Sequence, residues 1–311
     1  MNDVKALILC NSPIAIPGIK EFLFYGKVVA VAIPQGNKDL QYLLQPLLQE
    51  ANLPLILINK KEYKAQLMSA IESHQPTVGL MMTFPFLINA AMMAAVPKGF
   101  INFHFGILPQ SRGPQPILRH LVNGDAEAGV TVHIVDEGID TGPIIVQEKI
   151  QIELYDTYGI LQGKLAFLAA KLAANLLRIL SYGSIIPSLP QDESKAAYYS
   201  MPTAAELTIR WKEMEASSIV RIINACNPWN KGAGATINGW TLGCTEATIV
   251  GDCEEQQLVG GTILTCDAEH GVIVKTSDHK RLRLNIIYTT EGFFSGGRLA
   301  DFGIQVGMIF D

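Results

Sequence analysis

Residues 4–33 read VKALILCNSPIAIPGIKEFLFYGKVVAVAI. Two short apolar runs in this stretch, at residues 4–10 and 28–33, are rich in β-branched side chains and are typical of strands buried on both faces. Between them, residues 16–25 carry apolar side chains at helical spacing. The stretch therefore predicts a strand–helix–strand unit in which the strands are parallel and the crossover is right-handed.

The same alternation continues toward the middle of the chain. We expect a helix over residues 40–51, interrupted or started late by Pro46, and another over residues 63–74. Further strands are expected at residues 55–58, 78–82 and 100–103. This order predicts an α/β fold with an open, mostly parallel, Rossmann-like sheet. Because such sheets bind ligands beyond the carboxyl ends of their strands, we expect the chemistry in the loop after Phe103.

The second half of the chain has a different pattern. Residues 157–180 predict a long helix that ends at Tyr182-Gly183, and the proline-rich, polar residues 186–202 predict a linker. After them come short alternating runs punctuated by glycine, which predict a small, OB-like β-barrel. The expected division is a first domain at residues 1–187, a linker at residues 188–205 and a β-barrel domain at residues 206–311.

Composition excludes several classes of protein. The chain has 311 residues, of which 49% are hydrophobic and 17% charged, so it can form cores and is not a disordered chain. Its net charge of -5 argues against a global basic field for nucleic acid and leaves a local patch open. Five cysteines form no CxxC pair, which predicts reduced thiols and no metal site. We see no signal peptide and no run of about 18 uncharged apolar residues, so we expect a cytoplasmic protein without a membrane span.

Three polar residues near the middle of the chain can carry chemistry. Asn102 and His104 are two positions apart at the end of an expected strand, so their side chains point the same way. Asp140 lies in a loop between Gly138 and Gly142. An amide can donate to an oxygen that develops negative charge, a histidine can move a proton, and a carboxylate can hold that histidine. The set predicts acyl transfer through a tetrahedral intermediate. The alternative is a hydrogen-bonded histidine beside an ordinary Asp-Gly turn.

Short motifs in this region resemble, in their order, the signature of the 10-formyltetrahydrofolate-dependent formyltransferases. They are Asn102-Phe103-His104, Ile107-Leu108-Pro109, Arg112-Gly113, Gly129-Val130-Thr131 and Asp140-Thr141-Gly142. Further motifs are similar to the linker and the second-domain entry of methionyl-tRNA formyltransferase and of the formyltransferase of aminoarabinose-lipid synthesis. These are Gln191-Asp192-Glu193-Ser194, Arg210-Trp211 and Asn227-Pro228-Trp229. The resemblance covers nearly the whole chain and implies the formyltransferase fold.

The resemblance implies transfer of a formyl group from 10-formyltetrahydrofolate to an amine, without a metal. It makes Asn102, His104 and Asp140 catalytic: the first two stabilise the oxyanion, and Asp140 keeps His104 charged and helps to move a proton through water. It also implies a pterin pocket formed largely by backbone groups. The residues expected there are Phe84, Phe86, Leu87, Ile107, Leu108, Pro109, Asp136 and Gly138. For Phe84 and Phe86, ordinary packing beneath a loop is the alternative.

The chain departs from the family pattern at three places around this cleft. Gly106 stands where the family usually carries serine, which implies a differently shaped formyl-donor pocket. Residues 10–13 replace the glycine-containing turn that is expected after the first strand. Residues 34–39 form a short connection where methionyl-tRNA formyltransferases carry a longer basic loop. The loss of such a loop weakens RNA binding. The nearby His120 and His133 are interpreted as structural.

The missing basic loop favours a small or carrier-presented amine, such as an amino sugar nucleotide, as the acceptor. Three alternatives stay open: Met-tRNA recognised through the linker and second domain, a 10-formyltetrahydrofolate hydrolase, and a non-catalytic folate-binding module. Basic residues near the linker could form a patch for RNA and are equally well explained as solvated surface charges. They are Lys195, Arg210, Lys212 and Arg221. No oligomeric state is predicted.

Overall fold

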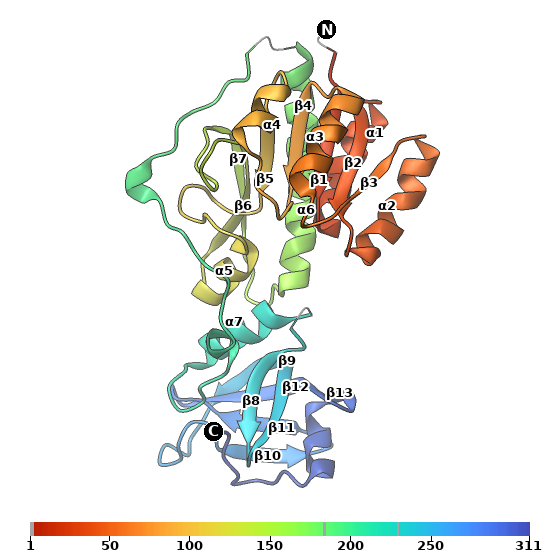
Figure 1. Ribbon diagram of the computed structural model, residues 1–311. Helices are drawn as coiled ribbons and strands as arrows, with labels where there is room; N and C mark the ends of the chain where they lie inside the picture. The colour runs from red at the N-terminus through yellow and green to blue at the C-terminus, as the bar shows by residue number, and fades with distance from the viewer. Residues whose placement is uncertain (1–2, 183–184, 229) are drawn as a thin grey trace. The chain divides into compact units, whose positions relative to one another are not determined.

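The computed structural model describes residues 3–182, 185–228 and 230–311 (Figure 1). Contacts divide the chain into two compact units. The first comprises Met1–Pro116, Ala128–Ile150 and Gln162–Tyr199, and the second comprises Ile117–Glu127, Gln151–Leu161 and Ser200–Asp311. Gly183 of the expected helix end and Trp229 of the second-half motifs lie outside the described residues. The domain boundaries expected near residues 187 and 205 stay a prediction.

A seven-stranded sheet forms the centre of the first unit, in the order β3-β2-β1-β4-β5-β6-β7. Its strands are β1 (Ala6–Cys10), β2 (Val28–Pro34), β3 (Leu55–Ile58), β4 (Val78–Met82), β5 (Phe100–His104), β6 (Glu127–Ile134) and β7 (Ile144–Gln151). The pairs from β3 through β5 are parallel, whereas β6 is antiparallel to β5. The open, mostly parallel α/β sheet expected from the sequence is confirmed.

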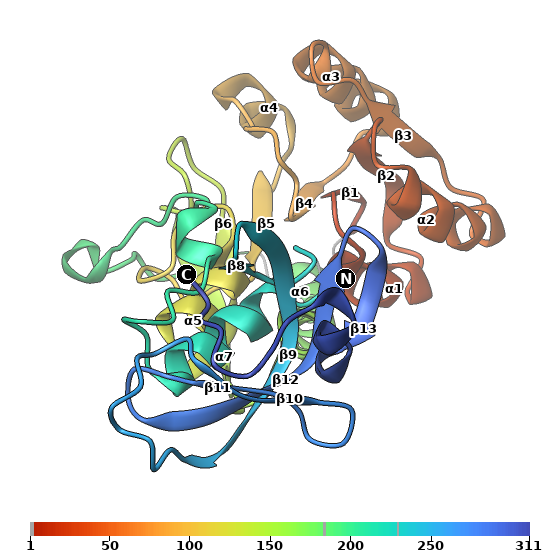
Figure 2. The same ribbon diagram turned by 90° about the horizontal axis from the view of Figure 1, so that it is seen from below.

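Helices cover both faces of this sheet. Every residue of β1 and of β4 is buried, as expected for strands packed between two helical layers. Helices α1 (Ile16–Phe24) and α6 (Tyr158–Tyr182) lie on one face, and α3 (Tyr63–His74) and α4 (Ala90–Ala95) lie on the other (Figure 2). From β1 the chain adds β2 and β3 on one side of the sheet and then β4 and β5 on the other, so a topological switch point lies between β1 and β4. Open sheets bind ligands at such a switch point.

Helix α2 (Lys38–Glu50) is continuous, so the interruption expected at Pro46 is wrong. The helix begins after Asn37, whose side-chain oxygen accepts a hydrogen bond from the Leu40 amide at 3.1 Å. Pro46 and Tyr42 are both exposed. Water can therefore bond the Tyr42 carbonyl group, which loses its helical partner at the proline.

Helix α6 is, within the described ranges, the one helix long and apolar enough to cross a membrane. However, 56% of its most apolar window is buried inside the protein. Leu165, Ala169 and Leu172 on its inner side are completely buried. These residues give α6 the packing of a core helix.

The second unit is built on an antiparallel sheet in the order β10-β11-β12-β9-β8, with β13 paired to β12. Its strands are β8 (Ala233–Ile237), β9 (Trp240–Asp252), β10 (Ile263–Asp267), β11 (Gly271–Lys275), β12 (Lys280–Thr289) and β13 (Gly292–Ser295). The helices α5 (Pro116–Asn123) and α7 (Ala216–Cys226) and the 3-10 helices η3 (Ala205–Leu207) and η4 (Gly296–Phe302) complete it. In β8, burial alternates with period two, as in a strand with one covered face. The second β domain expected from the sequence is confirmed.

Much of the expected linker packs onto the first unit. The remaining 3-10 helices of the described chain are η1 (Pro13–Ala15) and η2 (Glu193–Lys195), and η2 lies in this segment. Leu189 pairs with Ile144 through two backbone hydrogen bonds of 2.8 Å. Ala197 and Tyr199 exchange backbone hydrogen bonds with Arg112 at 3.0 and 2.9 Å. Residues 185–199 are therefore held in place by backbone pairing.

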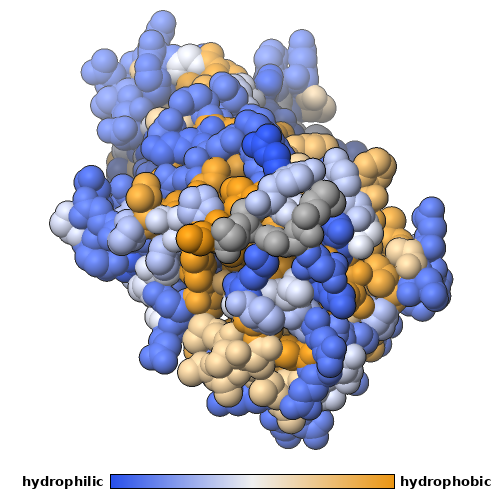
Figure 3. All heavy atoms as spheres, turned by 90° about the horizontal axis from the view of Figure 1, so that it is seen from above, coloured by the Kyte–Doolittle hydropathy of each residue, from blue (hydrophilic) through white to orange (hydrophobic). Residues whose placement is uncertain are grey.

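Apolar atoms on the face seen from above are interspersed with hydrophilic ones (Figure 3). Such a mixture is ordinary for a protein surface. Polar groups gathered in the interior are therefore the stronger candidates for a functional site.

Candidate active site

The pairing of β5 with β6 places three polar side chains on one face of the sheet. Asn102 and His104 are two positions apart on β5, so their side chains lie on the same face of the sheet. His133 of β6 lies directly opposite Asn102 in the antiparallel register. Cross-strand neighbours of this kind have their Cβ atoms about 5 Å apart. The side chains of Asn102 and His133 therefore meet.

His104 is buried and both of its ring nitrogens face oxygen atoms. Nε2 lies 2.6 Å from the Ser111 carbonyl oxygen, and Nδ1 lies 3.5 Å from Oδ1 of Asp140. Neutral imidazole has a hydrogen on only one nitrogen, whereas imidazolium donates from both. Two acceptors around the ring therefore suit the protonated form.

Asp140 lies in the loop between β6 and β7 and has a left-handed backbone, with φ of +57°. Its Oδ2 accepts a hydrogen bond from the Gly113 amide at 3.0 Å. Burial raises the pKa of this carboxyl, but the His104 charge, the His133 side chain and the Gly113 amide outweigh burial and lower the pKa to about 2. Asp140 is therefore an ionised carboxylate near neutral pH. The structure brings the three residues expected to be catalytic into one cluster.

His133 belongs to this cluster, although the sequence led to a purely structural interpretation. Its Nδ1 lies 2.9 Å from the Ile134 carbonyl oxygen and so carries the hydrogen. Nε2 lies 3.1 Å from Nδ2 of Asn102 and 3.8 Å from Oδ1 of Asp140. In its neutral form the ring accepts a hydrogen bond from the Asn102 amide, whose second N–H can then donate to a substrate oxygen. The strand register reveals the contact, and a single sequence contains no direct signal for it.

His120 belongs to the second unit. It is buried, with Nδ1 2.7 Å from Oδ2 of Asp125. The structural interpretation of His120 therefore agrees with its surroundings.

Of the aromatic residues expected to contact a pterin, Phe84 is buried in the core and Phe86 is partly buried and packs against it. Phe84 packs edge-on against Phe86 at 5.2 Å between ring centroids, and Phe86 stacks on Tyr63 at 4.9 Å. Phe84 is buried in the cluster that also contains Met92 of α4. This arrangement matches the packing alternative. Leu87, by contrast, is 64% exposed and can contact a ligand.

Residues 106–109 form a buried loop whose backbone groups bond to β6 and β7. The Thr131 hydroxyl donates to the Gly106 carbonyl at 2.7 Å and accepts from the Leu108 amide at 3.2 Å. Gln147 donates to the Leu108 carbonyl oxygen at 2.8 Å. Both backbone polar groups of Leu108 are thus used by the protein. Ile107 and Pro109 are buried beside it.

Asp136 shapes the loop that carries Asp140. Its Oδ1 accepts hydrogen bonds from the Gly138 amide at 3.1 Å and from the Thr141 hydroxyl at 2.6 Å. Such bonds are typical of an aspartate that stabilises a turn. In the structure, Asp136 therefore has a local role in setting the loop conformation.

Gly106 lies against the active-site histidine. A Cβ atom at this position would lie 2.8 Å from Nε2 of His104 and 2.7 Å from Cβ of Pro116. The absence of a side chain therefore leaves room for the His104 ring. A serine at this position would occupy that room.

The rim beyond β1 and β2 is formed by neutral amides. Nδ2 of Asn37 donates to the backbone oxygen and to Oδ1 of Asn11, at 2.8 and 2.9 Å. The backbone N–H of Asn11 donates to the hydroxyl oxygen of Thr83 at 3.3 Å. The connection from β2 to α2 is only residues 35–37.

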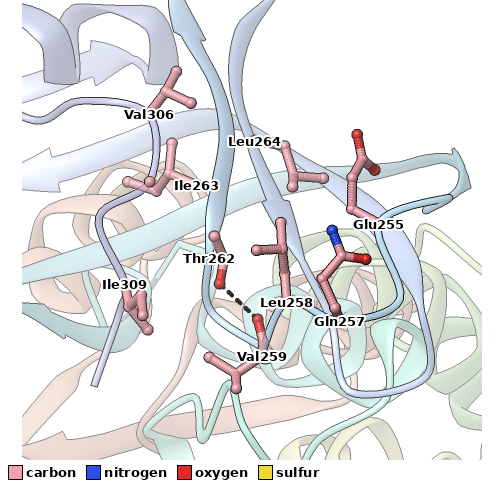
Figure 4. Close-up of a pocket in the computed structure, with 10 residues that line it drawn as sticks. Glu255, Gln257, Leu258, Val259, Thr262, Ile263, Leu264, Val306 and Ile309 are labelled. Atoms are coloured by element: carbon pink, nitrogen blue, oxygen red, sulfur yellow. Dashed lines mark hydrogen bonds between the residues drawn. The ribbon is translucent and has the colours of Figure 1, made fainter.

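No metal site is found in the part of the chain that the structure describes, which contains no suitable group of three or more His, Cys, Asp or Glu side chains. An open pocket of about 450 Å³ lies in the second unit, beside β10 and the C-terminal segment (Figure 4). Glu255 is the one titratable residue among those that line this pocket. The pocket therefore lacks an acid–base pair, and the cluster around His104 is the candidate active site.

Comparison with known proteins identifies relatives along most of the chain. Residues 28–177 match the family described as formyl transferase, and residues 203–292 match the formyl transferase C-terminal domain. A methionyl-tRNA formyltransferase of Nitrosomonas eutropha is 29% identical over 246 residues, which are 79% of this chain and 75% of that protein. One from Nitrosomonas europaea is 32% identical over 232 residues, or 73% and 69% of the two chains.

The fold is also similar to that of a solved N-formyltransferase from Helicobacter canadensis, in complex with folinic acid and dTDP-3-aminofucose. The TM-score is 0.68 at 19% identity, over 90% of this chain and 98% of that one. At this level of identity, the likeness concerns the fold.

Proposed function

The chain belongs to the formyl transferase family, and on that premise we propose that it transfers the formyl group of 10-formyltetrahydrofolate to an amine. The observation that supports this most is the cluster of Asn102, His104 and Asp140 at the carboxyl end of β5. A hydrogen-bond donor, a protonated imidazole and an ionised carboxylate within one cluster are the groups that formyl transfer requires.

The acceptor nitrogen attacks the formyl carbon, a C–N bond forms, and the formyl oxygen becomes negatively charged. The second N–H of Asn102 donates to that oxyanion, and the positive charge of the His104 imidazolium stabilises it electrostatically. When the intermediate collapses, the bond from the formyl carbon to the folate nitrogen breaks, and the proton lost by the amine reaches that nitrogen through water. Asp140 keeps His104 protonated and oriented throughout.

For the folate we propose contacts with the loops at residues 84–88, 106–109 and 136–140. Exposed Leu87 and the backbone of the Asp136 loop, including Gly138, are the groups most open to a ligand. Phe84, Phe86, Ile107, Leu108 and Pro109 support these loops from beneath. We keep residues 1–187, 188–205 and 206–311 as the proposed catalytic domain, linker and acceptor-side domain, and a cytoplasmic location.

As acceptor we propose a small or carrier-presented amine, such as an amino sugar nucleotide. The three-residue connection between β2 and α2 supports this, because it offers no basic loop to RNA phosphates. Two of the basic residues considered for an RNA patch are paired: Lys195 with Asp192 and Arg210 with Glu213, each at 2.9 Å. These carboxylates offset the attraction for phosphate.

Met-tRNA is the second candidate, favoured by the sequence relatives, which are methionyl-tRNA formyltransferases. The two acceptors differ in their response to salt. Formylation of tRNA falls steeply as salt is added, because phosphate contacts release counterions, whereas formylation of a small amine changes much less.

The test is release of tetrahydrofolate from 10-formyltetrahydrofolate with a panel of amino sugar nucleotides, with Met-tRNA, and without an acceptor. Turnover with a sugar nucleotide alone supports the proposal, and turnover with tRNA alone assigns the second candidate. Equal release without an acceptor identifies a hydrolase. His104→Ala abolishes turnover and keeps folate binding, whereas the matched control His270→Ala, at an exposed position of the second unit, keeps both. Near-normal activity of His104→Ala would refute the mechanism.

A further inference from the structure

The side-chain amide of Gln191 reaches the loop that carries Asp140. Its Nε2 donates to the carbonyl oxygens of Asp140 and Gly142, both at 2.8 Å. Its Oε1 accepts from Nε and Nη2 of Arg112, at 3.3 and 2.9 Å. Both N–H groups and the oxygen are thus engaged, which leaves the amide one orientation. A flipped amide would place its oxygen against two carbonyl oxygens.

Arg112, which anchors Gln191, is itself fixed. Its guanidinium binds both carboxylate oxygens of Glu193, at 2.9 and 2.6 Å. Its backbone amide donates to Ala197 and its carbonyl group accepts from Tyr199. A two-point guanidinium–carboxylate pair is geometrically specific, and Arg112 is buried. Gln191 therefore bridges the Asp140 loop to a rigid support.

Asp140 needs such support because of its backbone. A φ of +57° is uncommon for a residue other than glycine and persists only where the surroundings hold it. Gln191 holds the carbonyl group of Asp140, and the amide of Gly113, the residue after Arg112, holds its carboxylate. Asp140 is thus held by Gly113 directly and by Arg112 through Gln191.

We propose that Gln191 is a positioning residue for the reaction: its amide holds the Asp140 backbone so that the carboxylate faces His104. This inference rests on the proposed role of Asp140. Without Gln191, the loop can relax toward negative φ and carry the carboxylate away from the imidazole. A displacement of about 1 Å at a catalytic group costs about 100-fold in rate.

The groups that face Asp140 determine what the loss of Gln191 does to the pH profile. They are His104 of β5, His133 of β6 and the guanidinium of Arg112. Since the carboxylate favours the protonated ring of His104, its displacement makes that ring lose its proton more readily. The alkaline limb of kcat therefore moves to lower pH.

The first experiment compares Gln191→Ala and Gln191→Glu with the wild type in the tetrahydrofolate-release assay. We expect kcat to fall about 10- to 100-fold, KM to change less than about threefold, and the alkaline limb to shift. Gln191→Glu keeps the bonds to Arg112 and places a charged oxygen against the two carbonyl groups, so it loses activity even where Gln191→Ala folds poorly. The control is Ser194→Ala, which removes only a bond to Asp192 and keeps kcat.

Asp140→Asn separates failure of this inference from failure of the proposed function. If Asp140→Asn is inactive while both Gln191 variants keep kcat within twofold, the inference is wrong and the role of Asp140 stands. If Asp140→Asn is active, the proposed mechanism fails and the inference fails with it. A lower melting temperature of the Gln191 variants, with kcat per folded molecule and the pH profile unchanged, would mean a merely structural role.

A second readout needs no acceptor. The Gly113 amide is bonded to Asp140, so its hydrogen exchange reports whether the carboxylate stays in place. We expect exchange at Gly113 to be at least about fivefold faster in Gln191→Glu, with exchange in β2 unchanged. Unchanged exchange at Gly113 in this variant overturns the inference.

Discussion

Replacing Gly106 by alanine tests how closely the His104 ring is confined. The new Cβ atom would lie 2.8 Å from Nε2 of His104 and 2.7 Å from Cβ of Pro116. Ordinary contacts begin near 3.4 Å, so the ring must retreat by about 0.6 Å. The retreat disturbs the hydrogen bond from Nε2 to the Ser111 carbonyl oxygen, which is now 2.6 Å long.

A hydrogen bond to a charged group contributes about 1.5–3 kcal/mol. Displacing the His104 ring by about 0.6 Å weakens transition-state stabilisation by about 1.4–2.7 kcal/mol. We therefore expect kcat/KM to fall about 10- to 100-fold. Folding stability falls by about 1–3 kcal/mol through overpacking beside Pro116. The assay is initial rates of tetrahydrofolate release with the acceptor found in the panel, and urea unfolding gives the stability.

The matched control is Gly163→Ala, at a position of α6 where a Cβ atom has nothing within 4 Å. It makes the same chemical change without a contact to the His104 ring, so its kcat/KM stays at the wild-type value. If Gly106→Ala keeps kcat/KM within twofold as well, the His104 ring position in the structure is not the one that matters for catalysis, and the argument from Gly106 is refuted.

Protonation of Asp140 destabilises the fold in acid. Because the pKa of Asp140 is lowered from 3.8 to about 2, its ionised form contributes about 2 kcal/mol to the free energy of unfolding above pH 4. This contribution is lost as the pH falls toward 2, and Asp140→Asn removes this part of the acid dependence in urea unfolding. His133→Leu frees the Asn102 amide to rotate and lowers kcat about tenfold at unchanged folate KM; an unchanged kcat would contradict the assigned contact. Gly163→Ala raises the unfolding free energy by about 1 kcal/mol, measured by thermal and urea unfolding. Cys266, the one cysteine that is not buried, is the thiol that a maleimide labels first in the folded protein, as peptide mass spectrometry will show.

The parallel sheet could be predicted because each strand and each helix has its own local pattern. The apolar runs of β1, β2 and β4 are continuous, and helical spacing separates them. The pattern failed at Pro46, where solvent exposure lets a helix continue through a proline, a fact about the surroundings rather than the residue.

Asn102, His104 and Asp140 could be proposed from the sequence because they lie in motifs with known chemistry, and the structure brings them into one cluster. His133 could not be assigned in the same way, because its role depends on which residue of β5 it opposes. Gln191 lay in a motif that indicated only a linker. Its contact with Asp140 spans 51 positions of sequence and exists only because the segment folds back onto the first unit.

The antiparallel pairing of β5 and β6 also limits how related chains can change in length. Side chains alternate along a strand, so one residue inserted within β6 before His133 turns this histidine to the opposite face, whereas two restore it. In the loop that precedes β6, odd and even changes in length are equally acceptable, because the length of a loop does not decide which strand residues pair. Insertions and deletions can therefore accumulate in that loop during evolution, while within the strand only even-numbered changes preserve the active site.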